Sequence, residues 1–491
     1  MLRSSTEATP LVRDAEQRDT TSYFKLLMIL MPALLGNTLE FFDYACYSNL
    51  TTEIAKANFG DSAGGSEYFV WGAFSLGQAA RPVGGAIFGA LADRHGRKAV
   101  ILWATIGMLV STVLLGCIPT YRQCGETCKW AGFALILLLR TAQGLCAAGE
   151  VVIALTLAFE QAGPSRMGVG VAMVTISGSA GFLLATSGAL LMETLTTEDQ
   201  RLDWGWRVPF WMAVPVGVPI LLLQRHMEES CEFRALADQA YHADKAALAS
   251  ERGKAVPLVQ QPQQQQQARP SMGSLIGGVL RTQRLPFVVT WGVIAYHATW
   301  HYGMITYMKD ELITRDILGT SEAGFAATLA MIATMCSELV FGFILDHSTL
   351  SRMIRIAAPV LFFAGWPTWV LITAPGINMA PYIGAVTAGA LYGSHVVFIA
   401  ITVAIFPTAT RATALGLAYN FSQLCFGAPA PFLNQMFLDV LGQTGMQKWL
   451  VDSIAPSIWL YVAMIAGAAT LCAAFQNDAM RRVLEGTEVM H

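Results

Sequence analysis

The feature that most constrains this chain is a series of long apolar segments that recurs along almost its whole length. A helix needs about 20 mostly apolar residues to cross the hydrocarbon core of a bilayer. Twelve windows of this kind follow one another, separated by polar breaks, at approximately 24–50, 67–91, 99–119, 131–159, 167–194, 206–225, 285–308, 322–345, 353–374, 381–406, 411–440 and 456–476. We therefore expect an all-α integral membrane protein with twelve transmembrane helices.

The composition supports the same class. Of the 491 residues, 54% are hydrophobic and only 13% are charged, whereas soluble domains carry about 25% charged residues. A net charge of −3 gives no reason to expect a nucleic-acid partner. No arrangement of nucleophile and base is recognisable, so we expect neither an enzyme nor a cofactor. The partners to expect are the lipid bilayer and a small molecule.

The longest polar break, residues 226–284, divides the windows six and six. It contains a run of five glutamines, 263–267, a low-complexity composition that cannot bury a core. Two six-helix halves joined by such a linker are typical of secondary transporters, whose site lies between the repeats near the membrane midplane. We expect an N-terminal tail at 1–23, an N-terminal half at 24–225, a disordered linker at 226–284, a C-terminal half at 285–476 and a C-terminal tail at 477–491.

The distribution of basic residues predicts the orientation. An even number of spans places both termini on one side of the membrane, and cytoplasmic loops carry an excess of Lys and Arg. Most of the 31 Lys and Arg residues lie in the tails and in the loops on the same side as the tails. Both termini and the linker are therefore expected in the cytoplasm.

The turn between the second and third windows carries the most specific motif. It reads Gly89-Ala-Leu-Ala-Asp93-Arg94-His-Gly96-Arg97-Lys98. A basic turn alone would be only a topology signal, but this spacing resembles the loop that marks the major facilitator superfamily. The resemblance implies the major facilitator fold and a gating role for Gly89, Asp93, Arg94, Gly96, Arg97 and Lys98. A degraded copy, with Asp346 and Arg352, follows the eighth window, where an internal repeat would place it.

Further segments narrow the resemblance to the metabolite:proton symporter family, which includes proline/betaine, citrate and oxoglutarate carriers. They are Gly36-Asn37 with Glu40, Asp43 and Tyr44; Arg81-Pro82 with Gly84-Gly85; Arg140 with Gln143-Gly144 and Gly149-Glu150; Trp204-Gly205-Trp206-Arg207; and Phe406-Pro407-Thr408 with Arg411. The similarity is stronger over 24–235 than over 285–440. The degraded second loop is the main departure from the family pattern.

Charged residues inside predicted spans are costly in a membrane and usually serve a function. Glu40 and Asp43 are three residues apart and share a helix face, and Arg81 lies at similar depth on the second span. An Arg that a substrate can take from a carboxylate would couple proton binding to substrate binding. We therefore interpret Glu40 and Asp43 as proton-coupling residues and Arg81 as a substrate ligand. A permanent ion pair that fixes helix packing remains the alternative.

Arg140 and Glu150 are the charged residues of the fourth span. Ten residues separate them, which is too far for a direct pair, so each needs a partner elsewhere. The resemblance to the superfamily favours a role in proton transfer for Arg140. For Glu150, proton handling and gating or loop anchoring are equally compatible with the sequence.

The seventh span is rich in aromatic side chains and carries His297, Trp300 and His301. Two His residues one helical turn apart do not make a closed metal site, and no metal is expected. An aromatic face can hold a quaternary ammonium group by cation–π contact, or simply form an interfacial belt. Both readings stay open. His395, in the tenth span, is either a packing residue or a proton carrier. With Arg81 and Tyr44, these residues form the candidate substrate site.

We therefore expect a monomeric secondary transporter that moves a small carboxylate-bearing metabolite, either an organic acid or a zwitterion such as proline or betaine, together with protons. A uniporter and a non-transporting nutrient sensor are the alternatives. The glutamine run and a segment at 7–12 that resembles a vacuolar sorting signal favour a eukaryotic plasma membrane or endomembrane, vacuolar or lysosomal. The substrate, the choice between H⁺ and Na⁺, and a disulfide between Cys124 and Cys128 are left open.

Overall fold

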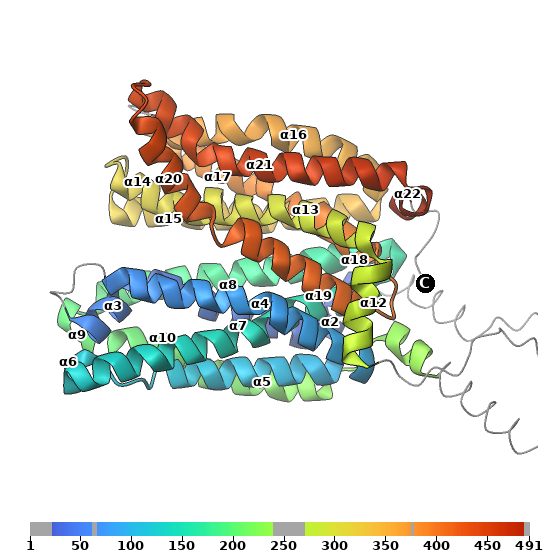
Figure 1. Cartoon of the computed structure of the whole chain (residues 1–491), viewed down its shortest axis with the longest axis horizontal. Coiled ribbons are helices and arrows are strands. Elements are labelled where there is room, and N and C mark those ends of the chain that lie inside the picture. Colours follow the sequence, from blue (N-terminus) through green and yellow to red (C-terminus); the bar gives the residue numbers. More distant parts are fainter. Residues whose placement is uncertain (1–21, 61–65, 239–270, 375–377, 486–491) are drawn as a thin grey trace, which may run out of the picture.

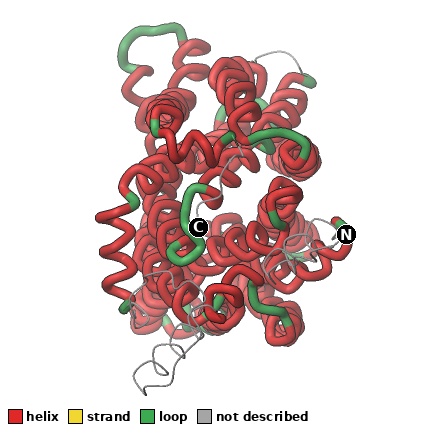
Figure 2. Tube along the Cα trace, turned by 90° about the vertical axis from the view of Figure 1, so that its right-hand side faces the viewer, coloured by secondary structure: helices red, strands yellow, loops and turns green. Residues whose placement is uncertain are grey.

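The computed structural model describes residues 22–60, 66–238, 271–374 and 378–485, and this part of the chain contains helices but no strand. The long helices run side by side in two bundles, one above the other in Figure 1. Figure 2 views the same helices nearly end-on. The N-terminal bundle is built from α2 (Tyr23–Asn49), α4 (Ser66–His95), α5 (Arg97–Leu115), α7 (Glu126–Ala162), α8 (Met167–Leu195) and α10 (Val208–His226).

Several spans of the C-terminal bundle are interrupted helices. Its helices are α13 (Arg284–Trp300), α14 (Tyr307–Thr314), α15 (Thr320–Asp346), α16 (Leu350–Ile372), α17 (Ala380–Tyr392), α18 (His395–Ala404), α19 (Arg411–Ser422), α20 (Ala430–Gly442) and α21 (Lys448–Gln476). A π-helical turn, η3 (His301–Thr306), joins α13 to α14, and a second, η4 (Gln423–Gly427), follows α19. Such π-turns are rare and concentrate at functional sites.

Short helices mark the two ends of the molecule. At one end, called here the α3 end, lie α3 (Thr51–Phe59), α6 (Tyr121–Cys124) and α9 (Glu198–Asp203). At the opposite end, called the α12 end, lie α12 (Met272–Thr282) and α22 (Asp478–Leu484). Two short 3₁₀ turns, η1 (Pro164–Arg166) and η2 (Gly205–Arg207), complete the loops. A disulfide joins Cys124 and Cys128 at the α3 end, which answers the question left open by the sequence.

The predicted spans correspond to helices. Nine helices of the described residues are long and apolar enough to cross a membrane, and the bent pair Arg411–Asn434 and Met436–Gly442, which covers α19, η4 and α20, makes a tenth. The other two predicted windows fall on α4, which carries Arg81 at its centre, and on α13, which has 17 residues and continues through η3 into α14.

The region expected to be a disordered linker is partly helical. Residues 231–238 form a helix after α10, and α12 begins at Met272, preceded by the N-cap Ser271, whose side chain accepts a hydrogen bond from the backbone of Ser274. The low-complexity argument did not foresee these helices, because it was drawn from the glutamine run and extended to the whole break. The run itself lies outside the described residues.

Glycines bring helices of the two bundles together near the α12 end. A Cβ atom added at Gly85 of α4 would overlap the backbone oxygen of Gly416 of α19, and one added at Gly89 would overlap Ala412. Small residues allow helix backbones to approach closely in membranes. The glycines of the motifs in α4 therefore allow the bundles to meet without an intervening side chain.

Candidate functional site: a central cavity and a closed end

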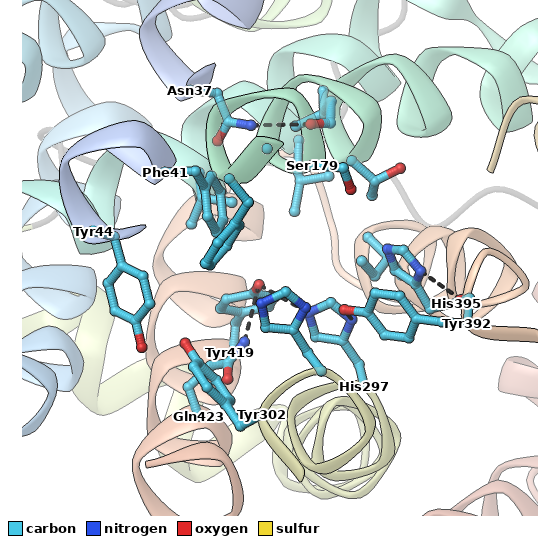
Figure 3. A pocket seen from close by; sticks show the side chains of 18 of the residues that line it. Asn37, Phe41, Tyr44, Ser179, His297, Tyr302, Tyr392, His395, Tyr419 and Gln423 are labelled. Atoms are coloured by element: carbon cyan, nitrogen blue, oxygen red, sulfur yellow. Dashed lines mark hydrogen bonds between the residues drawn. The ribbon is translucent and has the colours of Figure 1, made fainter. Parts of the chain in front are cut away.

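A polar cavity lies between the two bundles, about midway along the long helices (Figure 3). The N-terminal bundle contributes Asn37, Phe41, Tyr44, Gln78, Arg81 and Ser179, and the C-terminal bundle contributes His297, His301, Tyr302, Glu338, Tyr392, His395, Tyr419 and Gln423. A cavity with polar groups from both repeats is the arrangement expected of a transporter site. Among its described lining residues, Arg81 is the single Lys or Arg side chain.

Arg81 connects the cavity to Glu40. Its Nη2 donates to Glu40 Oε1 at 2.8 Å, and its Nε donates to Asn420 Oδ1 of α19 at 3.3 Å. Both members of the ion pair are buried. The predicted pairing of Glu40 with Arg81 is therefore present in the structure, and Asn420 adds a contact from the other bundle that the sequence did not indicate.

Asp43 does not join this pair, although the sequence grouped it with Glu40 and Arg81. It lies in a second, smaller compartment inside the N-terminal bundle, which shares Tyr44, Gln78 and Arg81 with the central cavity. Arg140 Nη1 lies 3.3 Å from Asp43 Oδ2, and Gln143 Nε2 donates to both carboxylate oxygens at 3.1 Å.

The partner that Arg140 of the fourth span needed is therefore Asp43 of the first span. The guanidinium also lies over the ring of Tyr47, 3.5 Å from its centroid, a favourable cation–π geometry. Two separate carboxylate–arginine pairs, Glu40–Arg81 and Asp43–Arg140, thus stand side by side in the N-terminal bundle.

Glu150 occupies a different position, apart from these pairs. It is fully buried between α2, α5 and α7 and accepts a hydrogen bond from Thr105 Oγ1 at 2.8 Å. A Cβ atom at Gly36 would contact its carboxyl group and the amide of Gln224. Among the described residues no Lys or Arg forms an ion pair with Glu150, so its burial favours an interior role over the anchoring of a loop.

The aromatic residues of the seventh span divide into two groups. His297 and His301 line the cavity, and the Tyr392 hydroxyl lies 3.0 Å from His297 Nδ1. Trp300 does not line it: its indole is fully buried within the C-terminal bundle and donates to the backbone oxygen of Ala388 at 3.2 Å. The structure thus places Trp300 in helix packing, because its side chain points away from the cavity that His297 of α13 and His301 of η3 line.

Sequence reasoning missed Glu338. This residue of α15 is fully buried and lines the cavity, where Ser179 Oγ donates to its carboxylate at 3.3 Å and His395 Nε2 lies 3.4 Å away. An acidic residue at the centre of the eighth window was the available signal, by the same rule that singled out Glu40.

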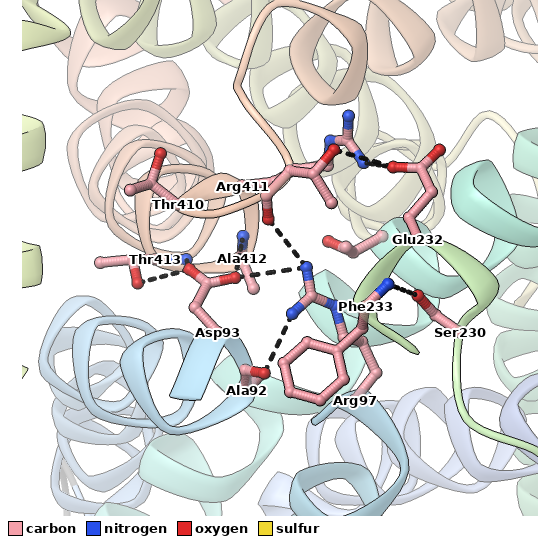
Figure 4. A network of polar contacts seen from close by, with 12 residues as sticks. Ala92, Asp93, Arg97, Ser230, Glu232, Phe233, Thr410, Arg411, Ala412 and Thr413 are labelled. Carbon is pink, nitrogen blue, oxygen red and sulfur yellow. Dashed lines mark hydrogen bonds and ion pairs between the residues drawn. The ribbon is translucent and has the colours of Figure 1, made fainter. Parts of the chain in front are cut away.

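The motif loop closes the α12 end (Figure 4). Asp93, near the end of α4, accepts hydrogen bonds from the backbone of Thr413 at 2.8 Å, from that of Ala412 at 3.3 Å and from the Thr413 hydroxyl at 2.7 Å. These groups form the first turn of α19, in the other bundle. A carboxylate there satisfies free N–H groups and the helix dipole. Asp93 therefore holds the two bundles together.

A buried charge network continues this closure. Glu160, at the end of α7, forms ion pairs with Arg97 at 2.9 Å and with Arg411 of α19 at 3.0 Å. Arg411 also contacts Glu232, which follows α10, at 2.8 Å, and Arg97 donates to the backbone oxygen of Thr408 at 3.0 Å. Glu160, Arg97 and Arg411 are all fully buried. The network joins both bundles and the first part of the predicted linker.

The aspartate of the degraded second loop makes the same kind of contact between the bundles as Asp93 does. Asp346, at the end of α15, accepts from the backbone of Gly168 at 2.6 Å and of Val169 at 3.3 Å, at the start of α8. Asp93 and Asp346 therefore make equivalent contacts, each from the end of one helix to the beginning of a helix in the opposite bundle. The second copy keeps the aspartate and a basic residue, Arg352, but it has His347, Thr349 and Leu350 in place of the Arg, Gly and Arg that follow Asp93 in the first copy.

Comparison with known proteins agrees with this geometry. The profile described as Major Facilitator Superfamily matches residues 33–431. The chain belongs to the major facilitator superfamily. The predicted fold class, an all-α major facilitator fold with twelve spans, is confirmed. A proton:xylose symporter, XylE bound to 6-bromo-6-deoxy-D-glucose, has the same fold, with a TM-score of 0.69 over 92% of this chain and 95% of that chain at 14% identity.

Curated relatives extend over most of the chain. A glycine betaine/proline/ectoine/pipecolic acid transporter, OusA of Dickeya dadantii, is 28% identical over 94% of this chain and 85% of its own length. An alpha-ketoglutarate permease of Escherichia coli is 27% identical over 89% of this chain and 93% of its own length. These relatives are membrane transporters rather than enzymes. They are bacterial, so the eukaryotic membrane expected from the sequence has no support here.

Proposed function

We propose that this protein is a proton-coupled symporter for a small zwitterionic metabolite of the betaine or proline type, working by alternating access. The observation that carries the proposal is the position of Arg81, which lies in the central cavity and is held there by Glu40. A substrate carboxylate that takes Arg81 would leave Glu40 without its counter-ion. A buried carboxylate without a counter-ion tends to bind a proton, so substrate and proton would bind together.

The lining of the cavity favours a zwitterion over a dicarboxylate. One Arg suits one carboxylate, whereas a dicarboxylate such as oxoglutarate calls for a second cation. Aromatic side chains also line the cavity, among them Tyr44, Phe182 and Tyr302, whose rings lie close together. Such faces attract quaternary ammonium groups. Neither ring nitrogen of His301 has a hydrogen-bond partner among the described residues, which leaves both available to a ligand.

Asp43 and Arg140 complete the proposal as a second acid–base pair, next to the substrate cavity rather than in it. Since the compartment around them shares Arg81 with the cavity, movement of Arg81 toward a substrate changes the charge that Asp43 and Arg140 experience. The symporter would then handle its proton on the N-terminal bundle, between Glu40 and Asp43.

The test is uptake into proteoliposomes of labelled glycine betaine, proline and oxoglutarate, with and without an imposed pH gradient and without Na⁺. We expect the two zwitterions to accumulate only with the gradient. Arg81→Lys should raise KM by about tenfold, because a point charge replaces a bidentate fork, while Arg122→Lys at the exposed α3 end should not. Uptake at the same rate with and without the pH gradient would indicate a uniporter. Uptake of oxoglutarate alone would contradict the proposal of a zwitterionic substrate.

We further propose that the α12 end faces the cytoplasm and that the protein is a monomer in the plasma membrane. Single cysteines at Ser271, beside α12, and at Asp199, in α9, distinguish the two faces because both residues are exposed. On a background without the other accessible cysteines, an impermeant thiol reagent added outside whole cells should label Asp199→Cys and leave Ser271→Cys unmodified. The reverse pattern would invert the orientation.

A further inference from the structure

Glu338 and His395 form a buried pair that the coupling scheme above does not use. They come from α15 and α18, and neither is more than 2% exposed. Among the described residues, no Lys or Arg forms an ion pair with Glu338, and the titratable side chain that lies within ion-pair distance of it is the His395 ring, at 3.4 Å. A carboxylate buried without a cation is very costly in a membrane protein. The pair must therefore be balanced by a proton.

The hydrogen bonds of His395 define where that proton lies. Its Nδ1 is 2.7 Å from the backbone oxygen of Tyr392. A carbonyl oxygen only accepts, so Nδ1 carries a hydrogen and the free position of the ring is Nε2, which faces Glu338. With no proton between them, two acceptors would face each other. With two, an uncompensated positive charge would be buried. One shared proton between Glu338 and Nε2 is the state that fits this geometry.

The pair also touches the opposite bundle. Ser179 of α8 donates its hydroxyl to both oxygens of Glu338, at 3.3 and 3.4 Å. Ser179 and Glu338 both line the central cavity, and they belong to helices of different bundles. Protonation of the pair therefore decides whether a neutral or an anionic group lies at the interface between α8 and α15.

We propose that Glu338 and His395 form a second proton site of the transporter, located in the C-terminal bundle, and that its protonation permits α8 and α15 to close over the central cavity. The proposal rests on the function proposed above. When the pair loses its proton to water, Glu338 becomes an anion that needs hydration, and a dry interface with α8 becomes unfavourable. Proton loss thus favours the open arrangement of these two helices.

Other titratable and charged groups face the same cavity. They are Tyr44 from α2, Arg81 from α4, His297 from α13, His301 and Tyr302 from η3, Tyr392 from α17 and Tyr419 from α19. His297 is the nearest of the histidines, with its ring centroid 4.8 Å from that of His395. Its two nitrogens already face the hydroxyls of Tyr392 and Tyr419, at 3.0 and 3.4 Å. Glu338 and His395 are therefore the pair whose own geometry requires a shared proton.

Two measurements on the full chain in lipid test the proposal. Infrared difference spectra between acidic and alkaline pH should contain the carbonyl band of a protonated carboxylic acid that Glu338→Gln removes and Glu338→Asp restores. Homoexchange of substrate should slow in the wild type as pH rises, and in Glu338→Gln this pH dependence should be lost. Glu311→Gln is the matched control, because it removes another buried carboxyl of the C-terminal bundle away from the cavity.

The outcomes separate the possible roles. An unchanged infrared band in Glu338→Gln would overturn the proposal. So would a KM raised equally at every pH with the pH profile intact, since that result would make Glu338 a substrate ligand. If Glu338→Gln does not fold, His395→Asn replaces it and should shift the same band. Should the wild type show no proton-driven uptake, the proposed symport fails, while the infrared band still decides whether this pair carries a proton.

Discussion

Replacing Glu40 by Gln is expected to abolish the accumulation of substrate against its gradient while leaving exchange of preloaded substrate active. Exchange needs no net proton movement, whereas accumulation does. In the proposed mechanism Glu40 and substrate compete for Arg81, so Glu40→Gln should also bind substrate at least as tightly as the wild type. Asp43→Asn should lose accumulation too, but with little change in affinity, since Asp43 lies on Arg140 rather than on Arg81.

The two variants are compared in proteoliposomes by pH-gradient-driven uptake, by exchange and by the substrate dissociation constant. Glu198→Gln is the control: it makes the same chemical change at an exposed ion pair with Lys56, far from the cavity. If both Glu40→Gln and Asp43→Asn still accumulate substrate against its gradient, these two carboxylates have a structural role rather than a role in coupling. Glu150 or the Glu338–His395 pair would then be the better candidate for the coupled proton.

Glu160→Gln is expected to open the α12 end. The carboxylate of Glu160 lies between Arg97 and Arg411, and all three residues are fully buried. Breaking a buried charge pair by removing one partner costs about 3–5 kcal/mol. That cost falls mainly on the closed arrangement, because an opened end lets water reach the two guanidinium groups. The equilibrium should therefore move toward the arrangement that is open at the α12 end.

Distances between spin labels measure this shift. Labels at His95 and Arg352 suit the purpose, since both residues are exposed at the α12 end and belong to different bundles. The distribution in Glu160→Gln should gain a longer component that is minor in the unchanged protein. An Arg234→Gln control, which removes an exposed ion pair with Glu228 from the same face, should keep the short distance. A short distance in both would mean that Asp93 and Asp346 suffice to keep the end closed.

The fold could be predicted because each membrane span is recognisable in the sequence as an apolar window. An apolar window long enough for a bilayer has few alternatives to a helix, and the motif at Asp93 then narrowed twelve helices to one architecture. The repeat of that motif was visible at Asp346, even though Arg352 is the one basic residue of the motif that it keeps. The residues that the motif contacts could not be predicted, because the partner of Asp93 is Thr413, which lies 320 residues away in the sequence.

The sequence identified the charged residues inside the N-terminal bundle, but which carboxylate pairs with which arginine was harder to predict. Glu40 and Asp43 share a face by helical spacing, yet a small difference in direction sends one to Arg81 and the other to Arg140. Spacing along one helix gives depth and approximate direction, but the neighbour depends on how four helices pack. Glu338 was missed for a different reason: its own span contains no basic residue that would have drawn attention to a charge pair.

The contact between Gly85 and Gly416 has a consequence for how such a carrier chooses its resting orientation. These glycines let two backbones touch where the bundles meet near the α12 end. A single methyl group there would act as a wedge, and it would do so without altering any charge, any ligand or the interior of either bundle. We therefore expect side-chain volume at this contact to shift the balance between the two orientations of the unloaded protein, without any change in the charged groups of the cavity.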